Sequence, residues 1–291
     1  MRTPLAHCKT PRLVTSMSAT TVSAALAMSG LVPLEATILL GHVIGRDRGW
    51  LAAHGDATLT RDQVLAYEAL ARRRRKGEPV AYLTGRREFF GLDLQVTPDV
   101  LIPRQETELL VELALAWLGS EATVSVLDLG SGSGAVALAI AHERPRARVV
   151  GADVAPAAVA LARSNAERLA IGNASFVESD WFQRIPREPF ALIVANPPYV
   201  AEEDSHLGRG DLRFEPVTAL ASGRDGLDAI CAIVAAAPGY LASGSRLALE
   251  HGHDQSAAVQ TLLRDAGFGD VASARDLAGI QRVTYGRFGP Q

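Results

Sequence analysis

The chain of 291 residues has only two cysteines, Cys8 and Cys231, and they lie far apart in the sequence. They provide neither a disulfide framework nor the spacing of a zinc site, which favours a reducing compartment, so we expect a cytoplasmic location. No apolar run is long enough to cross a bilayer, and a membrane partner is not expected. The formal net charge of −3 argues against a strongly basic nucleic-acid surface, although it leaves room for a local basic patch.

Residues 1–16 contain Arg2, Lys9 and Arg12 and could imitate the charged start of an export signal. The segment that follows is interrupted by Ser and Thr, which makes it a poor apolar signal core. We therefore expect Met17 to be the true start and residues 1–16 to be a disordered extension.

Residues 17–76 carry apolar side chains at helical spacing, and glycines and a proline divide them into several segments. This pattern predicts a small N-terminal helical bundle. The basic run Arg72–Lys76 closes its last helix. One interpretation is a solvated helix end that complements the helix dipole, and the other is a docking site for nucleic acid or an acidic partner.

Residues 77–104 are interpreted as a linker that contains a short β-hairpin around Gly91. Strands and helices then alternate through residues 105–291. Strands are predicted at 124–129, 148–152, 174–177, 190–195, 246–250, 270–275 and 282–287, and helices at 106–118, 134–143, 156–169, 226–237 and 255–266. Such alternation predicts an α/β fold with a doubly wound, mostly parallel, seven-stranded Rossmann-like sheet. The last two strands have no helix between them, so one of them is expected to run antiparallel at the edge.

The predicted strand 190–195 runs directly into Asn196-Pro197-Pro198-Tyr199. Two consecutive prolines fix φ and remove two N–H donors, so the turn is rigid. The Asn196 side-chain oxygen and the Pro197 carbonyl would then form an acceptor-rich pocket at the carboxyl end of a strand. The pocket suits a planar nitrogen with two N–H groups, such as an amide NH2 or an exocyclic base amine. The alternative is a proline-stiffened loop without chemistry.

A glycine-rich loop follows the first predicted strand. Its candidate binding residues are Asp128, Gly130, Ser131, Gly132, Ser133 and Gly134. The glycines allow a ligand to approach the backbone closely, and Asp153 at the end of the second strand can bind both hydroxyls of a ribose. Asp180 and Trp181 follow the third strand, where they could place a carboxylate near an adenine amine and a flat ring beside the base.

The same loop also fits the dinucleotide pattern G-x-G-x-x-A, but two features favour S-adenosylmethionine over NAD. A carboxylate at Asp128 would repel a pyrophosphate, because a pyrophosphate binds best at a helix N-terminus that has no carboxylate beside it. The same carboxylate would attract the ammonium group of a methionine moiety. The acceptor pocket at Asn196 is not needed for hydride transfer.

Methyl transfer to an amide nitrogen would then depend on orientation and preorganised dipoles. Hydrogen bonds to Asn196 and Pro197 would aim the nitrogen lone pair at the sulfonium methyl. Tyr199 is expected to stack on the planar acceptor with the polar edge of its ring free. Asn196, Pro197 and Tyr199 are thus the candidate catalytic residues, and Pro198 completes the substrate-binding turn.

In these motifs the chain resembles the protein-(glutamine-N5) methyltransferases that modify class-1 peptide chain release factors. The matching stretches lie at 77–85, 88–92, 101–104, 107–108, 128–134, 180–182, 196–199 and 210–216. The Asn-Pro-Pro-Tyr motif alone is shared with DNA adenine and rRNA guanine methyltransferases, whereas the stretches within 77–104 and 210–216 are much more restricted to the release-factor branch. Gln105 is one departure, because the family usually has proline there.

The resemblance implies a methyltransferase domain over 105–291 that binds S-adenosylmethionine at the loop, Asp153, Trp181 and Asn196. It also implies that residues 196–199 hold the glutamine of the Gly-Gly-Gln loop of a release factor and that the N-terminal bundle helps to grip this partner. We expect a monomer that contacts no nucleic acid directly.

Several alternatives stay open. The acceptor could be a DNA or rRNA base or a ribosomal-protein glutamine, or the chain could be a non-catalytic translation-factor adaptor. Residues 250–253, Glu-His-Gly-His, could suggest a metal, but no third ligand is evident and we predict none. The polar segment 200–211 could be a lid over the acceptor site or a solvated loop.

Overall fold

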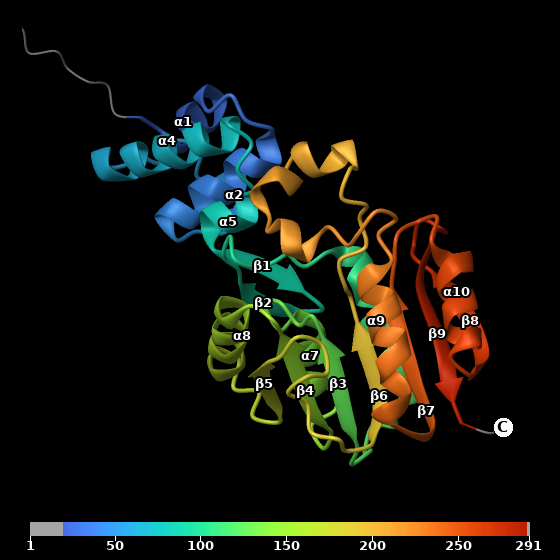
Figure 1. The fold of residues 1–291 in the computed structure, drawn as a ribbon. Helices are drawn as coiled ribbons and strands as arrows, with labels where there is room; N and C mark the ends of the chain where they lie inside the picture. Colours follow the sequence, from blue (N-terminus) through green and yellow to red (C-terminus); the bar gives the residue numbers. More distant parts are fainter. Residues whose placement is uncertain (1–19, 290–291) are drawn as a thin grey trace, which may run out of the picture. The chain divides into compact units, whose positions relative to one another are not determined.

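The computed structural model describes residues 20–289 (Figure 1). The chain divides into two compact units, one that ends at Lys76 and one that begins at Gly77. The extension predicted for residues 1–16 lies outside the described residues. Within residues 20–289, no helix is long and apolar enough to cross a membrane.

The described part of the N-terminal unit, residues 20–76, contains four helices: α1 (Val22–Met28), α2 (Pro33–Ile44), α3 (Arg48–Ala53) and α4 (Arg61–Arg75). Side chains define where they begin. The Thr60 hydroxyl accepts from the Gln63 N–H while the Gln63 side chain accepts from the Thr60 N–H, which is a complete capping box. The buried side chains of Leu39, Leu40 and Tyr67 form the interior of this unit.

The basic run lies in the last turn of α4 and at its C-cap. Arg74 makes two hydrogen bonds to Glu35 of α2, at 3.0 and 2.9 Å. Arg75 donates to the carbonyl of Ser29. These two cations therefore connect the end of α4 to other parts of the bundle.

The second unit begins with α5 (Val80–Thr84) and a hairpin of β1 (Arg86–Phe89) and β2 (Leu92–Gln95). Phe90 and Gly91 form its turn with φ of 50° and 76°, the positive values that a type I′ turn requires at both central positions. Phe89 and Leu94 are buried against the main sheet and its helices. Residues 77–104 thus belong to the same compact unit as the large sheet.

That sheet has seven strands in the order β5-β4-β3-β6-β7-β9-β8 (Figure 1). They are β3 (Ser125–Leu129), β4 (Arg148–Asp153), β5 (Ala174–Glu178), β6 (Phe190–Ala195), β7 (Leu241–Glu250), β8 (Phe268–Arg275) and β9 (Gln281–Phe288). The first five strands in this order, β5, β4, β3, β6 and β7, are parallel to one another. β9 is antiparallel to both of its neighbours, β7 and β8. The predicted doubly wound, mostly parallel fold is confirmed.

The expectation that the antiparallel strand lies at the edge is wrong. β9 lies between β7 and β8, and the edge strand β8 has the same direction as the parallel strands. After β7 the chain passes through the helix α10 (Ser256–Asp265) and forms β8 at the edge, one strand position away from β7. The turn after β8 then brings β9 back into the position between β7 and β8. Hairpin geometry makes β9 antiparallel.

Helices cover both faces of the sheet. On one face α6 (Glu108–Trp117), α7 (Ala135–Glu143) and α8 (Pro156–Arg168) pack against alternate strand residues, which include Leu192 and Val194. On the other, α9 (Asp228–Ala236) and α10 pack against the intervening residues, which include Ile193 and Ala195. β6 is apolar throughout because both of its faces are buried.

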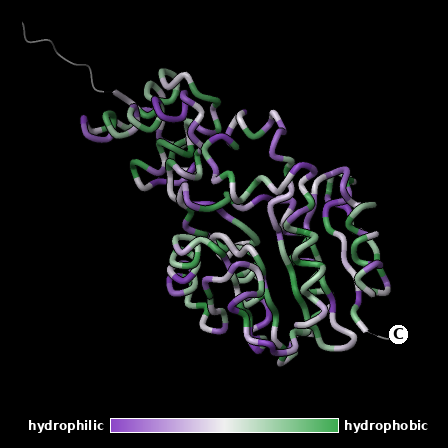
Figure 2. Tube along the Cα trace, in the orientation of Figure 1, coloured by the Kyte–Doolittle hydropathy of each residue, from purple (hydrophilic) through white to green (hydrophobic). Residues whose placement is uncertain are grey.

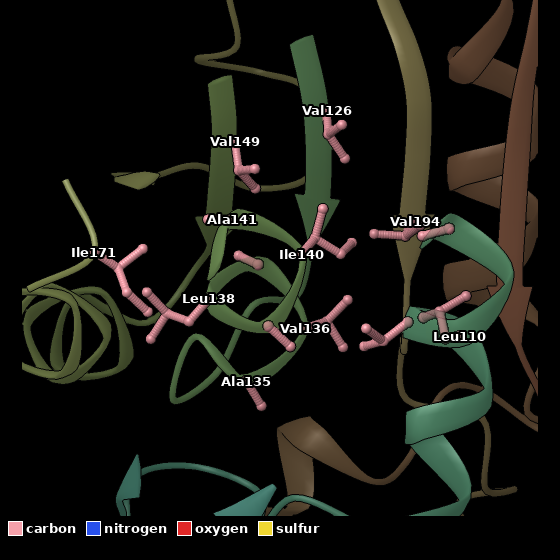
Figure 3. Close-up of a cluster of buried hydrophobic side chains, with 14 of the residues drawn as sticks. Leu110, Val126, Ala135, Val136, Leu138, Ile140, Ala141, Val149, Ile171 and Val194 are labelled. Carbon is pink, nitrogen blue, oxygen red and sulfur yellow. The ribbon is translucent and has the colours of Figure 1, made fainter. Parts of the chain in front are cut away.

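Figure 3 shows part of the first core, with Val136 of α7 close to Leu110 of α6 and Leu138 close to Ile171. Figure 2 shows that hydrophobic residues follow the central strands of the sheet. Five 3-10 turns lie in the described connections: η1 (Gln105–Thr107), η2 (Ser205–Gly208), η3 (Leu212–Phe214), η4 (Val217–Ala219) and η5 (Ala237–Gly239).

Candidate active site

A cleft opens at the carboxyl ends of β3 and β6, where the strand order reverses. This is the position at which open α/β sheets bind ligands. Its walls come from the loops after β3, β4, β5 and β6 and from two further segments, 99–107 and 216–219. Predicted site residues that line it are Asp128, Gly130, Ser131, Gly132, Ser133, Asp153, Asp180, Trp181, Asn196 and Pro198. Gly134, Pro197 and Tyr199 do not line it.

The glycine-rich loop turns through left-handed backbone, with φ of 73° at Gly130, 53° at Gly132 and 85° at Gly134. The N–H groups of Gly130 and Ser131 both donate to the carbonyl of Ala152 on β4, at 2.8 and 3.0 Å. Gly134 provides close packing, because a Cβ there would lie 3.0 to 3.1 Å from three neighbouring side chains.

Asp153 is held rigidly at the end of β4. Its two carboxylate oxygens accept from the N–H groups of Gly132 and Ala155, each at 2.9 Å. A carboxylate oxygen has more than one acceptor position, so both oxygens can still accept from a pair of hydroxyl groups.

Asp128 is the most deeply buried acidic residue of the cleft, with 1% of its surface exposed. It accepts one hydrogen bond, from the Ala137 N–H at 3.1 Å. Burial raises the pKa of Asp128 to about 7, and the nearby charge of Asp153 contributes to the rise. A cation placed beside Asp128 would relieve this cost. The buried hydroxyl of Ser131 also has no hydrogen-bond partner within residues 20–289.

Trp181 adopts a φ of 44°, which is uncommon for a residue other than glycine. The Ser179 hydroxyl holds this turn by donating to the Trp181 carbonyl and accepting from the Arg184 N–H, at 2.8 and 2.9 Å. A Cβ on Gly130 would lie 3.8 Å from the Trp181 ring. The aromatic ring therefore lies beside Gly130, and both residues line the cleft.

The turn after β6 lies beside the same loop. A Cβ on Gly130 would lie 3.7 Å from the carbonyl oxygen of Asn196. The side-chain nitrogen of Asn196 donates to the hydroxyl of Thr107 at 3.1 Å. The Asn196 nitrogen thus faces Thr107, and its amide oxygen is the group left to face a ligand.

The expectation that the polar edge of Tyr199 is free is wrong. The Tyr199 hydroxyl donates to Oε1 of Glu250 at 3.2 Å, and burial together with the Glu250 charge raises the pKa of Tyr199. Glu250 is 1% exposed, and its Oε2 has no hydrogen-bond partner within the described part of the chain. Burial raises the pKa of Glu250 to about 7.

The sequence did not indicate three residues that support this site, Thr107, Glu250 and Glu215. Thr107 and Glu250 contact the Asn-Pro-Pro-Tyr turn from distant parts of the sequence. Glu215 likewise fixes one wall of the cleft, because it accepts from Arg104 at 2.5 Å and from the Ile102 N–H at 3.3 Å. An acidic residue among apolar ones, as in Phe214-Glu215-Pro216, is the signal that could have indicated burial with a partner. Within residues 20–289, no group of three or more His, Cys, Asp or Glu is placed to hold a metal ion.

Three features define the class of S-adenosylmethionine-dependent methyltransferases: the sheet order, the glycine-rich loop, and the turn of residues 196–199 after the neighbouring strand, which is called the acceptor turn below. The family described as "Methyltransferase small domain" matches residues 105–210. Two solved methyltransferases share the fold with a TM-score of 0.53. One, from Pyrococcus furiosus, is 16% identical and covers 75% of this chain and 98% of its own. The other, a 16S rRNA N2 G1207 methyltransferase from Thermus thermophilus, is 22% identical and covers 69% of this chain and 49% of its own.

Sequence relatives identify the particular family. Release factor glutamine methyltransferases are 51% identical in Burkholderia pseudomallei, over 94% of this chain and 98% of theirs, and 49% identical in Bordetella pertussis, over 90% and 97%. The Escherichia coli protein of that name is 48% identical over 87% and 91%. The "PrmC N-terminal domain" also matches residues 20–85. This chain belongs to the release factor glutamine methyltransferase family, so the predicted resemblance, enzyme class and cofactor are confirmed.

Proposed function

We propose that this enzyme transfers the methyl group of S-adenosylmethionine to the side-chain amide nitrogen of the glutamine in the Gly-Gly-Gln loop of class-1 peptide chain release factors. The orientation of Asn196 carries the proposal. Its amide nitrogen is engaged by Thr107, so its oxygen is the group that faces an acceptor beside the glycine-rich loop.

The cleft fits the proposed cofactor. Asp153 would accept from the ribose hydroxyls, Asp128 would pair with the methionine ammonium group, and Trp181 would lie beside the adenine with Asp180 near its amine. The partnerless hydroxyl of Ser131 supports a polar ligand at this loop. When bound, S-adenosylmethionine supplies an electrophilic methyl group on a sulfonium.

The chain's own contribution is to orient the acceptor. An amide nitrogen is a poor nucleophile because its lone pair is delocalised into the carbonyl. The Asn196 side-chain oxygen and the Pro197 carbonyl would each accept one N–H of the glutamine amide, which increases electron density on its nitrogen and aims it at the cleft. No strong base is then required if the proton leaves after methyl transfer.

The proposal predicts that Asn196→Ala lowers turnover by on the order of 10²–10³, as loss of one preorganised hydrogen-bonding group does elsewhere. Turnover is measured with methyl-labelled S-adenosylmethionine and saturating release factor. Near-normal turnover of this variant would remove Asn196 from the mechanism.

The acceptor is tested with the wild-type enzyme and four substrates: release factor, the factor with the Gly-Gly-Gln glutamine replaced by alanine, ribosomal proteins, and nucleic acid as rRNA or duplex DNA. We expect label on the intact factor alone. Label on the alanine factor, on ribosomal proteins without the factor, or on nucleic acid would contradict the proposed acceptor.

We further propose that the enzyme works as a cytoplasmic monomer whose N-terminal bundle grips the release factor. The two distant cysteines support the location. Light scattering of the purified enzyme alone tests the monomeric state, and a dimer mass would contradict it.

A further inference from the structure

The carboxyl end of the acceptor turn is held by a side chain from a distant segment. Gln255 occupies the N-cap position of α10. Its side-chain nitrogen donates to the carbonyl of Tyr199 and to the carbonyl of Asp225, each at 3.0 Å. Its side-chain oxygen accepts from the Gly252 N–H at 2.7 Å. One amide group therefore joins the acceptor turn to the loop before α9 and to the loop after β7.

The orientation of the Gln255 amide follows from its partners. The two carbonyl oxygens can only accept and the Gly252 N–H can only donate, so a reversed amide would meet like groups at all three contacts. All three partners are backbone groups, and the assignment therefore depends on no state of ionisation.

The Gln255 side chain does not serve its own helix. An N-cap residue usually accepts from the first N–H groups of the helix that it begins. Within the described residues, the Gln255 side chain makes no such hydrogen bond to α10. It extends instead to the acceptor turn, which indicates a role outside the stability of α10.

The backbone around this contact is closely packed. Gly226 has a φ of 78°, and a Cβ on it would lie 2.1 Å from the Tyr199 carbonyl oxygen and 2.7 Å from the Gln255 side-chain nitrogen. A side chain at position 226 would displace both groups. Three segments of the chain thus meet at the Tyr199 carbonyl, with the Gln255 amide between them.

Pro197 and Pro198 have no N–H that could anchor the acceptor turn, so its position depends on its two ends. One end continues from β6, and the other is Tyr199. We propose that Gln255 is a positioning residue that holds the Tyr199 end of the turn. The side-chain oxygen of Asn196 and the Pro197 carbonyl then keep the positions from which they accept the substrate amide. This inference rests on the proposed function, which gives those two oxygens that role.

The first test compares three variants. Gln255→Met keeps the length of the side chain and removes all three hydrogen bonds. Gln255→Glu keeps an oxygen for the Gly252 N–H but loses both donors and places a negative charge beside two carbonyls. Gln260→Met is the matched control, because Gln260 lies on the same helix and donates to the Ser273 hydroxyl at 2.9 Å.

Turnover is measured with methyl-labelled S-adenosylmethionine and saturating release factor. We expect kcat to fall on the order of 10- to 100-fold in both Gln255 variants, as small misplacements of reacting groups do elsewhere. It should stay near the wild-type value in Gln260→Met, which breaks hydrogen bonds of α10 away from the acceptor turn.

Binding of the cofactor separates positioning from general damage to the fold. Neither Gln255 nor Tyr199 lines the cleft, so both Gln255 variants should bind S-adenosylmethionine with nearly the wild-type Kd while kcat falls. Wild-type kcat in either Gln255 variant, an equal loss in Gln260→Met, or a Kd that rises as much as kcat falls would overturn the inference.

A second measurement needs no substrate. Directly after the turn, the Val200 N–H donates to the Leu220 carbonyl and the Ser222 N–H donates to the Val200 carbonyl, each at 2.9 Å. These two amides should exchange with deuterium on the order of tenfold faster in Gln255→Met and at the wild-type rate in Gln260→Met. Unchanged exchange in Gln255→Met would refute the positioning role whichever group the enzyme methylates, whereas failure of the proposed function alone would leave the exchange pattern intact.

Discussion

The binding of S-adenosylmethionine should depend strongly on pH through Asp128. The pKa of its carboxyl is raised to about 7 by burial, and the ligand's ammonium group favours the ionised form. Asp128 is about nine-tenths ionised at pH 8 and about one-hundredth ionised at pH 5. If only the ionised form binds tightly, Kd should increase on the order of 100-fold between pH 8 and pH 5, or about 3 kcal/mol.

The assay is equilibrium dialysis of labelled S-adenosylmethionine at several pH values between 5 and 8. Asp128→Asn should bind more weakly at pH 8 and should show little change in Kd across the range. Glu250→Gln is the matched control, because the pKa of Glu250 is also raised to about 7 and this variant should keep the wild-type pH dependence. A flat wild-type profile, or the same slope in Asp128→Asn, would refute the assignment of Asp128 to the ammonium group.

The stability of the ligand-free enzyme should change with pH in the opposite direction. The folded pKa of Asp128 lies above the usual value of 3.8, so the folded state binds the proton more tightly than the unfolded state does. The resulting stabilisation is complete below about pH 4 and is lost as pH rises toward about 7. The pKa of Glu250 is raised in the same way, so the contribution of Asp128 is the part of the stability slope that Asp128→Asn removes, and its sign should be opposite to that of the binding slope.

Two further predictions concern the walls of the cleft. Gly134→Ala should lower the free energy of unfolding by about 2–4 kcal/mol in urea titrations, because it combines a left-handed φ with close contacts to Phe176, Ala162 and Leu138. Gly132→Ala is its control and should cost only about 1–2 kcal/mol, since its Cβ would meet nothing within 4 Å; equal losses would contradict the packing argument. Glu215→Gln should speed dissociation of S-adenosylmethionine, followed by Trp181 fluorescence, because the Arg104–Glu215 pair joins segments whose neighbours line the cleft. An unchanged dissociation rate would show that the pair does not hold this wall.

Strands that are buried on both faces were predictable from the sequence. β6 was predicted with its observed bounds, because Phe190–Ala195 is apolar throughout and a polar residue and two prolines end it. β7 was predicted from residue 246, whereas it begins at Leu241. Its first half contains Ser243, Gly244 and Ser245, which are not typical strand residues, so the sequence did not predict a strand there. The position of β9 was likewise inaccessible, since sequence alone does not tell which gap a hairpin fills.

The same distinction applies to the site. Residues of the glycine-rich loop and of the acceptor turn stand next to one another in the sequence, so their joint chemistry could be inferred. Thr107 is 89 positions from Asn196, and Glu250 is 51 positions from Tyr199. Nothing in local spacing connects such residues, and a buried Glu resembles any strand-ending Glu until the fold shows what surrounds it.

The acceptor turn has to be held from outside itself. Pro197 and Pro198 have no N–H to donate, so the rigidity that two prolines give to the turn does not orient the side chains beside them. Orientation comes from η1 through Thr107 and from the end of β7 through Glu250. Just before α10, Gln255 adds a third anchor by donating to the Tyr199 carbonyl at 3.0 Å. In the proposed mechanism the short motif supplies the acceptor groups, and hydrogen bonds from three distant segments hold Asn196 and Tyr199 in place.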